Sequence, residues 1–154
     1  SRKVETYIPF GHRGEVEMEL NERLEPRCSL VKYTPGSSPE ILHYYIDKGY
    51  RGVVLEGTGL GHVASDWIEG IGRAKEENIP VVVTSQCLRG RICDRVYDTG
   101  RDMLDAGAIE GGDMLPEVAL VKLMWVLANN PEEVGTLMKT SLAGEISHSI
   151  PIIV

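Results

Sequence analysis

Residues 52–62, GVVLEGTGLGH, decide the fold, because an apolar run is followed there by glycines at every second position. Residues 53–55 are two valines and a leucine, and such a run bounded by glycines is typical of a strand buried in a parallel sheet. Gly57, Gly59 and Gly61 predict a tight loop where this strand ends. We therefore expect a buried strand with a glycine-rich loop at its carboxyl end.

Strand and helix patterns alternate around this stretch. Residues 28–33 (CSLVKY) and 80–85 (PVVVTS) predict strands on either side of it, and residues 108–109 a short fourth strand. Helices are expected at residues 39–48 (capped by Ser37 or Ser38), 65–78 (capped by Ser65 or Asp66), 99–106, 116–129 and 131–142. This alternation predicts a small three-layer α/β/α domain, flavodoxin-like, with a parallel sheet of about four strands and right-handed crossovers.

The first part of the chain has a different character. Residues 1–27 combine prolines and glycines with many charges, and we interpret them as an interdomain linker. Within it, residues 15–20 (EVEMEL) alternate charged and apolar side chains, which predicts one edge strand. Residues 28–154 form the small α/β domain. The chain begins without a methionine, and we expect it to be a fragment of a longer protein.

Composition narrows the functional classes. The chain has 154 residues, 42% hydrophobic residues and a net charge of −7, which suits a globular domain and argues against a nucleic-acid-binding surface. Its three cysteines are typical of reduced thiols in a cytoplasmic protein. No apolar run in the sequence approaches the length of a membrane span, so we expect no membrane contact.

The candidate site lies where the central strands end, because ligands of parallel α/β sheets bind outside the carboxyl ends of the strands. His62 follows the glycines at that edge; the alternative is a loop histidine satisfied by backbone groups. Thr84, Ser85 and Gln86 end the next strand, and their hydroxyl and amide groups suit recognition of a carboxamide or carboxylate. The alternative is that these three side chains cap a helix or hold turns.

The sequence lacks the motifs of several common binding and catalytic sites. The glycines of residues 57–62 do not have the dinucleotide spacing, no Gly-Lys-Ser/Thr phosphate loop follows, and Gly-x-Ser-x-Gly is absent. The cysteines and histidines show no zinc spacing, so no metal site is expected. Tyr97, in a long loop after residue 86, either faces a substrate or packs in the core or an interface. These residues alone predict an α/β domain with a polar loop edge.

Several motifs resemble the carboxyl-terminal domain of the asparaginase family. They are VLEGTGLGHV (54–63), VVTSQCLRGRI (82–92), YDTGRDMLDAGAIEGGDMLPEVALVKLMWVL (97–127) and LAGEI (142–146). Many simple bacterial asparaginases carry Asn where this chain has His62. That difference favours the branch of glutaminase subunits found in archaeal glutamyl-tRNA(Gln) amidotransferases.

The resemblance implies a two-domain enzyme. The larger amino-terminal domain of such proteins opens with a Gly-Gly-Thr signature and holds the threonine nucleophile; this chain lacks the signature, so no catalytic residue is expected in it. The small domain lends residues to the active site of a neighbouring subunit, and His62 matches a residue lent in this way. No family role follows for Thr84, Ser85 or Gln86. The resemblance also implies a homodimer, in which a second copy of the chain is the neighbour.

The same resemblance implies partners beyond the chain itself. These are the amino-terminal asparaginase domain of the same protein and a partner subunit that uses ATP and Mg²⁺. The complex hydrolyses glutamine, and the released ammonia converts Glu-tRNA(Gln) into Gln-tRNA(Gln). We expect tRNA contact only through the complex, and no cofactor in this segment.

Two alternatives remain open from the sequence. The chain could be the small domain of a free cytoplasmic L-asparaginase, which would act without an ATP-using partner. It could also be a non-catalytic flavodoxin-like module for dimerisation or binding, which would have no Gly-Gly-Thr strand upstream.

Overall fold

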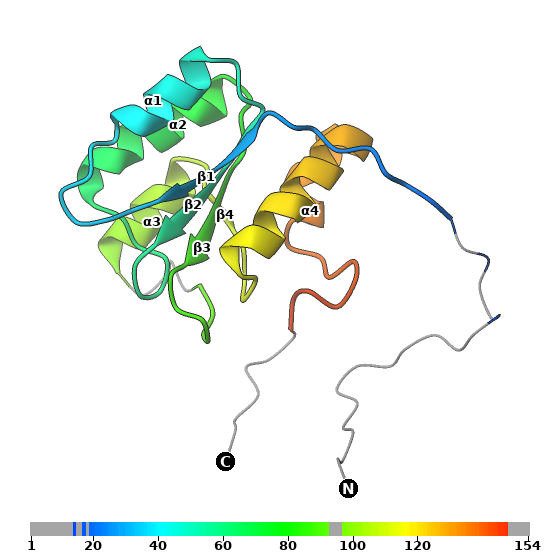
Figure 1. Ribbon diagram of the computed structural model, residues 1–154. Helices are drawn as coiled ribbons and strands as arrows, with labels where there is room; N and C mark the ends of the chain where they lie inside the picture. Colours follow the sequence, from blue (N-terminus) through cyan, green and yellow to red (C-terminus); the bar gives the residue numbers. More distant parts are fainter. Residues whose placement is uncertain (1–13, 15–16, 18, 93–96, 148–154) are drawn as a thin grey trace, which may run out of the picture.

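The computed structural model describes residues 14, 17, 19–92 and 97–147. Within these residues four strands form one parallel sheet in the order β1-β2-β3-β4 (Figure 1). They are β1 (Cys28–Lys32), β2 (Gly52–Gly57), β3 (Val81–Ser85) and β4 (Ile109–Glu110). All three pairings are parallel, as the sequence predicts.

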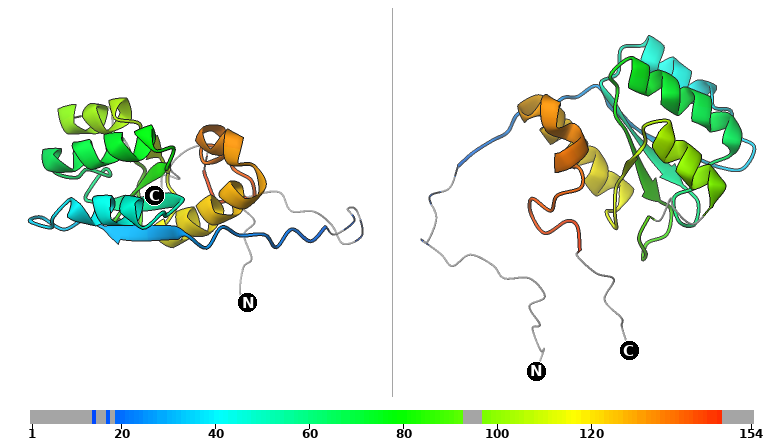
Figure 2. Two further views of the ribbon diagram at one scale, coloured as in Figure 1. Left: turned by 90° about the horizontal axis from the view of Figure 1, so that it is seen from above. Right: turned by 180° about the vertical axis from the view of Figure 1, so that it is seen from behind.

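Helices cover both faces of the sheet. α1 (Glu40–Asp47), α2 (Ile68–Glu76) and α3 (Asp98–Asp105) lie on one face, and α4 (Pro116–Asn129) lies on the other (Figures 1 and 2). Each strand is joined to its next neighbour in the same direction, so right-handed crossovers place the first three helices on the same face. The predicted three-layer α/β/α architecture is confirmed.

The alternation of side chains along the strands builds one apolar core on each face. Val53 and Leu55 of β2 are buried in the core beneath α1 and α2, together with Trp67. Val54, between them in sequence, is buried in the core beneath α4, as is Val82 of β3. Both sides of β2 are therefore buried, which explains why its sequence is uniformly apolar.

Helix α4 begins and ends at the predicted residues. Pro116 occupies the first turn, where its missing N–H removes no helical hydrogen bond. Ala119, Leu123 and Val126 recur at helical spacing and are fully buried against the sheet. This helix covers one face of the sheet from β1 to β3.

The predicted helix over residues 131–142 is wrong in its length. The structure has a 3₁₀ turn (Pro131–Glu133) and the single helical turn α5 (Val134–Leu137). The Glu145 carboxylate accepts hydrogen bonds from the backbone N–H groups of Leu142 and Ala143. A side chain that takes up backbone donors in this way competes with helix, which explains the early end.

The predicted helix caps are corrected in one case. Ser65 and Asp66 make no side-chain cap; they open a 3₁₀ turn (Ser65–Trp67), and α2 starts after it. Trp67, at the end of this turn, is fully buried. In the first helix, the Ser38 hydroxyl does accept a hydrogen bond from the Glu40 N–H at 3.2 Å.

Some predictions fall outside the described residues. They concern the zinc spacing where it involves His12, Cys93 and His148, and half of the edge strand at residues 15–20. Its other half, Glu17, Glu19 and Leu20, is described and belongs to no strand. None of the helices in the described part of the chain has the length and apolar character that crossing a membrane requires.

The described end of the amino-terminal segment lies along α4 (Figure 2). The Trp125 indole N–H donates to the carbonyl of Asn21 at 3.3 Å, and the Asn129 amide donates to that of Arg23 at 3.1 Å. The backbone N–H of Glu25 donates to the carbonyl of Met124 at 2.9 Å. The segment before β1 is therefore anchored to the outer side of this helix.

Candidate functional site

The glycine loop after β2 folds back on itself as a small bridged turn. Thr58 and His62 pair in an antiparallel bridge, and each backbone N–H donates to the other's carbonyl at 2.9 Å. The Thr58 hydroxyl donates a further hydrogen bond to the His62 carbonyl at 3.1 Å. These bonds hold the backbone of His62 in place at the carboxyl edge of the sheet.

The glycines are required by the shape of this turn. Gly59 and Gly61 have φ values of 55° and 105°, which L side chains rarely adopt. A Cβ atom on Gly57 would lie 2.3 Å from the carbonyl oxygen of Gly61, closer than any packing allows. On Gly61 it would lie 2.6 Å from a methyl carbon of Ile92. The turn that presents His62 therefore favours glycine at positions 59 and 61 and leaves no room for a side chain at position 57.

The His62 ring packs edge to face against Tyr97, with ring centroids 5.2 Å apart. Its Nε2 atom is buried and has no hydrogen-bond partner among the described residues. Buried polar atoms in folded proteins are nearly always hydrogen-bonded, so an unpaired one points to a missing group. An imidazole nitrogen can donate to or accept from such a group.

A hollow of about 420 Å³ opens beside the ring. It is lined by Thr58, Gly59, Leu60, His62, Tyr97 and Thr99. The hollow is open to solvent on this chain, and both the turn and the start of α3 contribute to it. The hollow therefore has room for a small ligand beside the His62 ring.

Thr84 and Ser85 lie beside the turn at the end of β3. Thr84 is fully buried, and its hydroxyl has no partner among the described residues. The Ser85 hydroxyl donates to the carbonyl of Gly59 at 2.5 Å and accepts from the N–H of Cys87 at 2.9 Å. Ser85 therefore ties the end of β3 to the turn that carries His62.

The Gln86 amide holds strand ends together. Its nitrogen donates to the carbonyls of Tyr33 at 2.5 Å and Glu56 at 3.2 Å, and its backbone N–H donates to Gly57 at 2.9 Å. The interpretation in which these side chains hold turns describes the contacts of Ser85, whereas Gln86 joins the ends of β1 and β2. Of the predicted site residues, His62 is the one that both lines a hollow and has a buried polar atom without a partner in the described part of the chain.

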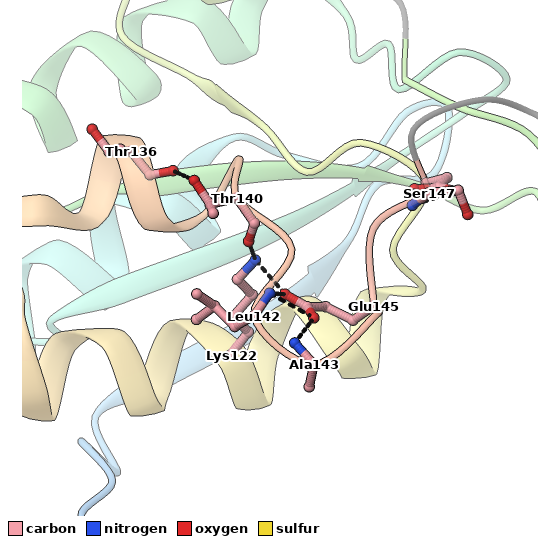
Figure 3. Close-up of polar contacts among 8 residues, drawn as sticks. Lys122, Thr136, Thr140, Leu142, Ala143, Glu145 and Ser147 are labelled. Atoms are coloured by element: carbon pink, nitrogen blue, oxygen red, sulfur yellow. Dashed lines mark hydrogen bonds and ion pairs between the residues drawn. The ribbon is translucent and has the colours of Figure 1, made fainter. Parts of the chain in front are cut away.

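Lys122 and Glu145 form a charged cluster beside α4 that the sequence patterns did not predict (Figure 3). The buried Lys122 ammonium of α4 donates to the Thr140 carbonyl and pairs with Glu145, both at 2.6 Å. Burial opposes ionisation of Glu145, but the hydrogen bonds from Lys122, Leu142 and Ala143 outweigh it and lower the pKa to about 2. The sequence signal is a lysine in the middle of a mostly apolar helix, with a glutamate in the LAGEI stretch that follows.

Asp113 also has a described role that its sequence position did not predict. Its carboxylate accepts from the N–H of Ser147 at 3.0 Å and lies 3.7 Å from the Arg91 guanidinium. Partial burial raises the pKa of Asp113, but these donors outweigh burial and leave the pKa below its ordinary value. Asp113 therefore links Arg91, in the loop after β3, to Ser147.

The thiols and acids of the described residues do not form a metal centre. No group of three or more His, Cys, Asp or Glu side chains gathers at one point in residues 19–92 and 97–147. Burial raises the pKa of the Cys28 thiol to about 12, with a smaller contribution from Glu25, so this thiol stays protonated at neutral pH.

A family model for the glutaminase/asparaginase C-terminal domain matches residues 27–138. A glutamyl-tRNA(Gln) amidotransferase subunit from Methanosarcina barkeri is 60% identical over 149 residues, covering 96% of this chain and 35% of the relative. The corresponding subunit from Archaeoglobus fulgidus is 62% identical over 135 residues, covering 87% and 32%. The chain therefore spans about a third of the length of these curated relatives.

Two solved structures share the fold. The thermostable L-asparaginase from Thermococcus kodakarensis superposes with a TM-score of 0.81 at 36% identity, covering 92% of this chain and 44% of that one. L-asparaginase I from Vibrio cholerae has a TM-score of 0.82 at 29% identity, covering 94% and 45%. The motifs at residues 54–63 and 97–127 thus lie within a matched family domain, and the chain belongs to the glutaminase/asparaginase C-terminal domain family.

Proposed function

We propose that this chain is the small domain of a glutaminase that releases ammonia for the conversion of Glu-tRNA(Gln) into Gln-tRNA(Gln). Support comes from relatives at about 60% identity that are named as glutamyl-tRNA(Gln) amidotransferase subunits. The observation that carries the proposal is the buried Nε2 of His62, which has no partner among the described residues and lies beside an open hollow. In this proposal residues 1–27 are the linker, and the catalytic domain precedes them in the full-length protein.

The reaction is hydrolysis of a carboxamide, in which glutamine and water give glutamate and ammonia. A hydroxyl nucleophile attacks the amide carbon, ammonia leaves, and water then cleaves the acyl intermediate. We assign the nucleophile to a threonine of the catalytic domain. This chain contributes His62, whose Nε2 binds a polar atom of the substrate or orders a water beside it, as a residue lent to a neighbouring subunit.

The other partners follow from the same proposal. A second copy of the protein provides the neighbouring subunit, which gives a homodimer. A separate subunit uses ATP and Mg²⁺ to activate the tRNA-bound glutamate, so no cofactor is assigned to this segment. Contact with tRNA occurs only through that complex.

A free L-asparaginase is the second candidate function. It is favoured by the two solved structures, both named L-asparaginase, whose TM-scores are 0.81 and 0.82. The fold and the small-domain role would be the same. The difference would lie in the preferred amide and in the absence of an ATP-using partner.

Ammonia release by the full-length protein tests the proposal. The protein expressed from the complete reading frame is assayed with glutamine and asparagine, with and without its ATP-using partner subunit and Glu-tRNA(Gln). We expect glutamine hydrolysis that is strongest in the presence of the partner and tRNA, and no hydrolysis by residues 1–154 alone. Asparagine hydrolysis that is indifferent to the partner would favour the second candidate. A complete reading frame with no catalytic domain would contradict both.

A further inference from the structure

Beside the amino-terminal segment, part of the outer side of α4 is apolar and exposed in the described part of the chain. Val118 and Val121 are 38% and 57% exposed, on the side opposite to the buried Ala119 and Leu123. A helix with apolar side chains on its outer side as well as on its core side is normally covered on both. The exposed side is therefore built for contact with another body.

This side of the helix is the floor of a groove of about 730 Å³. Leu24 of the amino-terminal segment forms one wall and Leu142 of the loop after α5 forms the other, with exposures of 48% and 45%. Val121 and Trp125 line the floor between them. Apolar side chains from three separate parts of the chain thus converge on one concave surface.

Both walls of the groove are held by hydrogen bonds. The amino-terminal wall is fixed by the indole of Trp125, which donates to the carbonyl of Asn21. The other wall is fixed by the Lys122 and Glu145 pair, whose carboxylate also binds the N–H of Leu142 (Figure 3). The groove is therefore preorganised, which lowers the entropic cost of filling it.

We propose that this groove binds the catalytic domain of the full-length protein, which precedes residues 1–154 in the proposed function. The inference rests on the proposed function, since it requires a longer, two-domain protein. The relatives are about three times as long as this chain, so a large domain remains to be placed. The segment that would join that domain to this one forms a wall of the groove, so the domain is tethered at its rim.

Tethering and shape favour this occupant over a second copy. A short tether gives a local concentration in the millimolar range, so a modest apolar contact is enough for docking. A contact between two copies about a twofold axis must be self-complementary, and two concave grooves cannot fill each other. Glu117 at the rim adds negative charge, so we expect apolar side chains with a nearby Lys or Arg on the docking surface.

Val121→Asp tests the inference, with Tyr44→Asp as the control. Tyr44 is similarly exposed at 52%, but it lies on α1, across the sheet from α4. In the full-length protein we expect Val121→Asp to increase the rate of proteolytic cleavage within residues 1–27 at least ten-fold and to separate one thermal transition into two. Tyr44→Asp should do neither. In residues 1–154 alone, Val121→Asp should leave the melting temperature nearly unchanged.

Val118→Asp serves as a second variant, in case an aspartate at residue 121 impairs folding of the chain itself. Unchanged cleavage with both groove variants would overturn the inference. So would a dimer of residues 1–154 in sedimentation that Val121→Asp abolishes, because a second copy would then be the occupant. Ammonia release by the wild-type protein is measured separately, so failure of the proposed function and failure of this docking are distinguishable.

Discussion

The imidazole of His62 meets the ring of Tyr97 edge to face, with centroids 5.2 Å apart and an interplanar angle of 82°. This contact joins the turn after β2 to the residue that precedes α3. It restrains the imidazole while its Nε2 atom stays without a partner among the described residues. We therefore treat Tyr97 as a positioning residue for His62.

Tyr97→Ala should lower kcat/KM for glutamine in the full-length protein. Edge-to-face aromatic pairs contribute about 0.5–1.5 kcal/mol, so we expect a loss of about two-fold to ten-fold. Tyr97→Phe keeps the ring and should retain nearly full activity. Equal losses in both variants would mean that the phenol hydroxyl, and not the ring contact, is what matters.

Gly57→Ala should destabilise the domain. The added Cβ would lie 2.3 Å from the backbone oxygen of Gly61, so the turn must shift. We expect a loss of about 1–3 kcal/mol in the free energy of unfolding, measured by chemical denaturation. Gly72→Ala is the matched control, because a Cβ there meets nothing within 4 Å and helix α2 favours alanine. A harmless Gly57→Ala would show that the turn is adaptable.

Stability should fall in acid because of Glu145. Its pKa is about 2 in the folded protein against an ordinary 4.5, so the contribution is complete above about pH 4.5 and is lost as pH falls towards 2. At about 1.4 kcal/mol per pKa unit, it amounts to no more than about 3.5 kcal/mol. Glu145→Gln should remove this part of the pH dependence and lower stability at pH 7. Parallel curves for both proteins between pH 5 and 2 would contradict the assignment.

Thr84→Val should be neutral or stabilising in residues 1–154. The Thr84 hydroxyl is buried without a partner among the described residues, and an apolar group of the same shape removes that cost. We expect a gain of up to about 2 kcal/mol in the free energy of unfolding. A clear loss of stability would reveal an internal partner for this hydroxyl.

Local patterns predicted the parts of the fold that depend on neighbouring residues. The apolar run at residues 53–55 is buried as a central strand, and Pro116–Asn129 is helical as expected from its spacing. The helix after Pro131 ends early because Glu145 binds backbone donors and pairs with Lys122, 23 residues before it. A contact of this range leaves no periodic pattern in the sequence.

The site was predictable only in part for the same reason. The glycines indicated that His62 lies at the carboxyl edge of the sheet, and the turn places it there. The hydrogen bonds of Ser85 to Gly59 and of Gln86 to Tyr33 join residues 26 and 53 positions apart, so the sequence left the roles of Ser85 and Gln86 open. Contacts between loops depend on the packed strands that carry them.

The kinetics of His62→Ala in the full-length protein test the central proposal most directly. Loss of one hydrogen bond to the substrate or its water costs about 1–3 kcal/mol, so we expect kcat/KM for glutamine to fall about ten-fold or more. The same substitution in residues 1–154 should shift the melting temperature by only a few degrees, because the Nε2 atom makes no described bond there. Full activity of the variant together with collapse of residues 1–154 would show that His62 is a structural loop residue and would contradict the proposal.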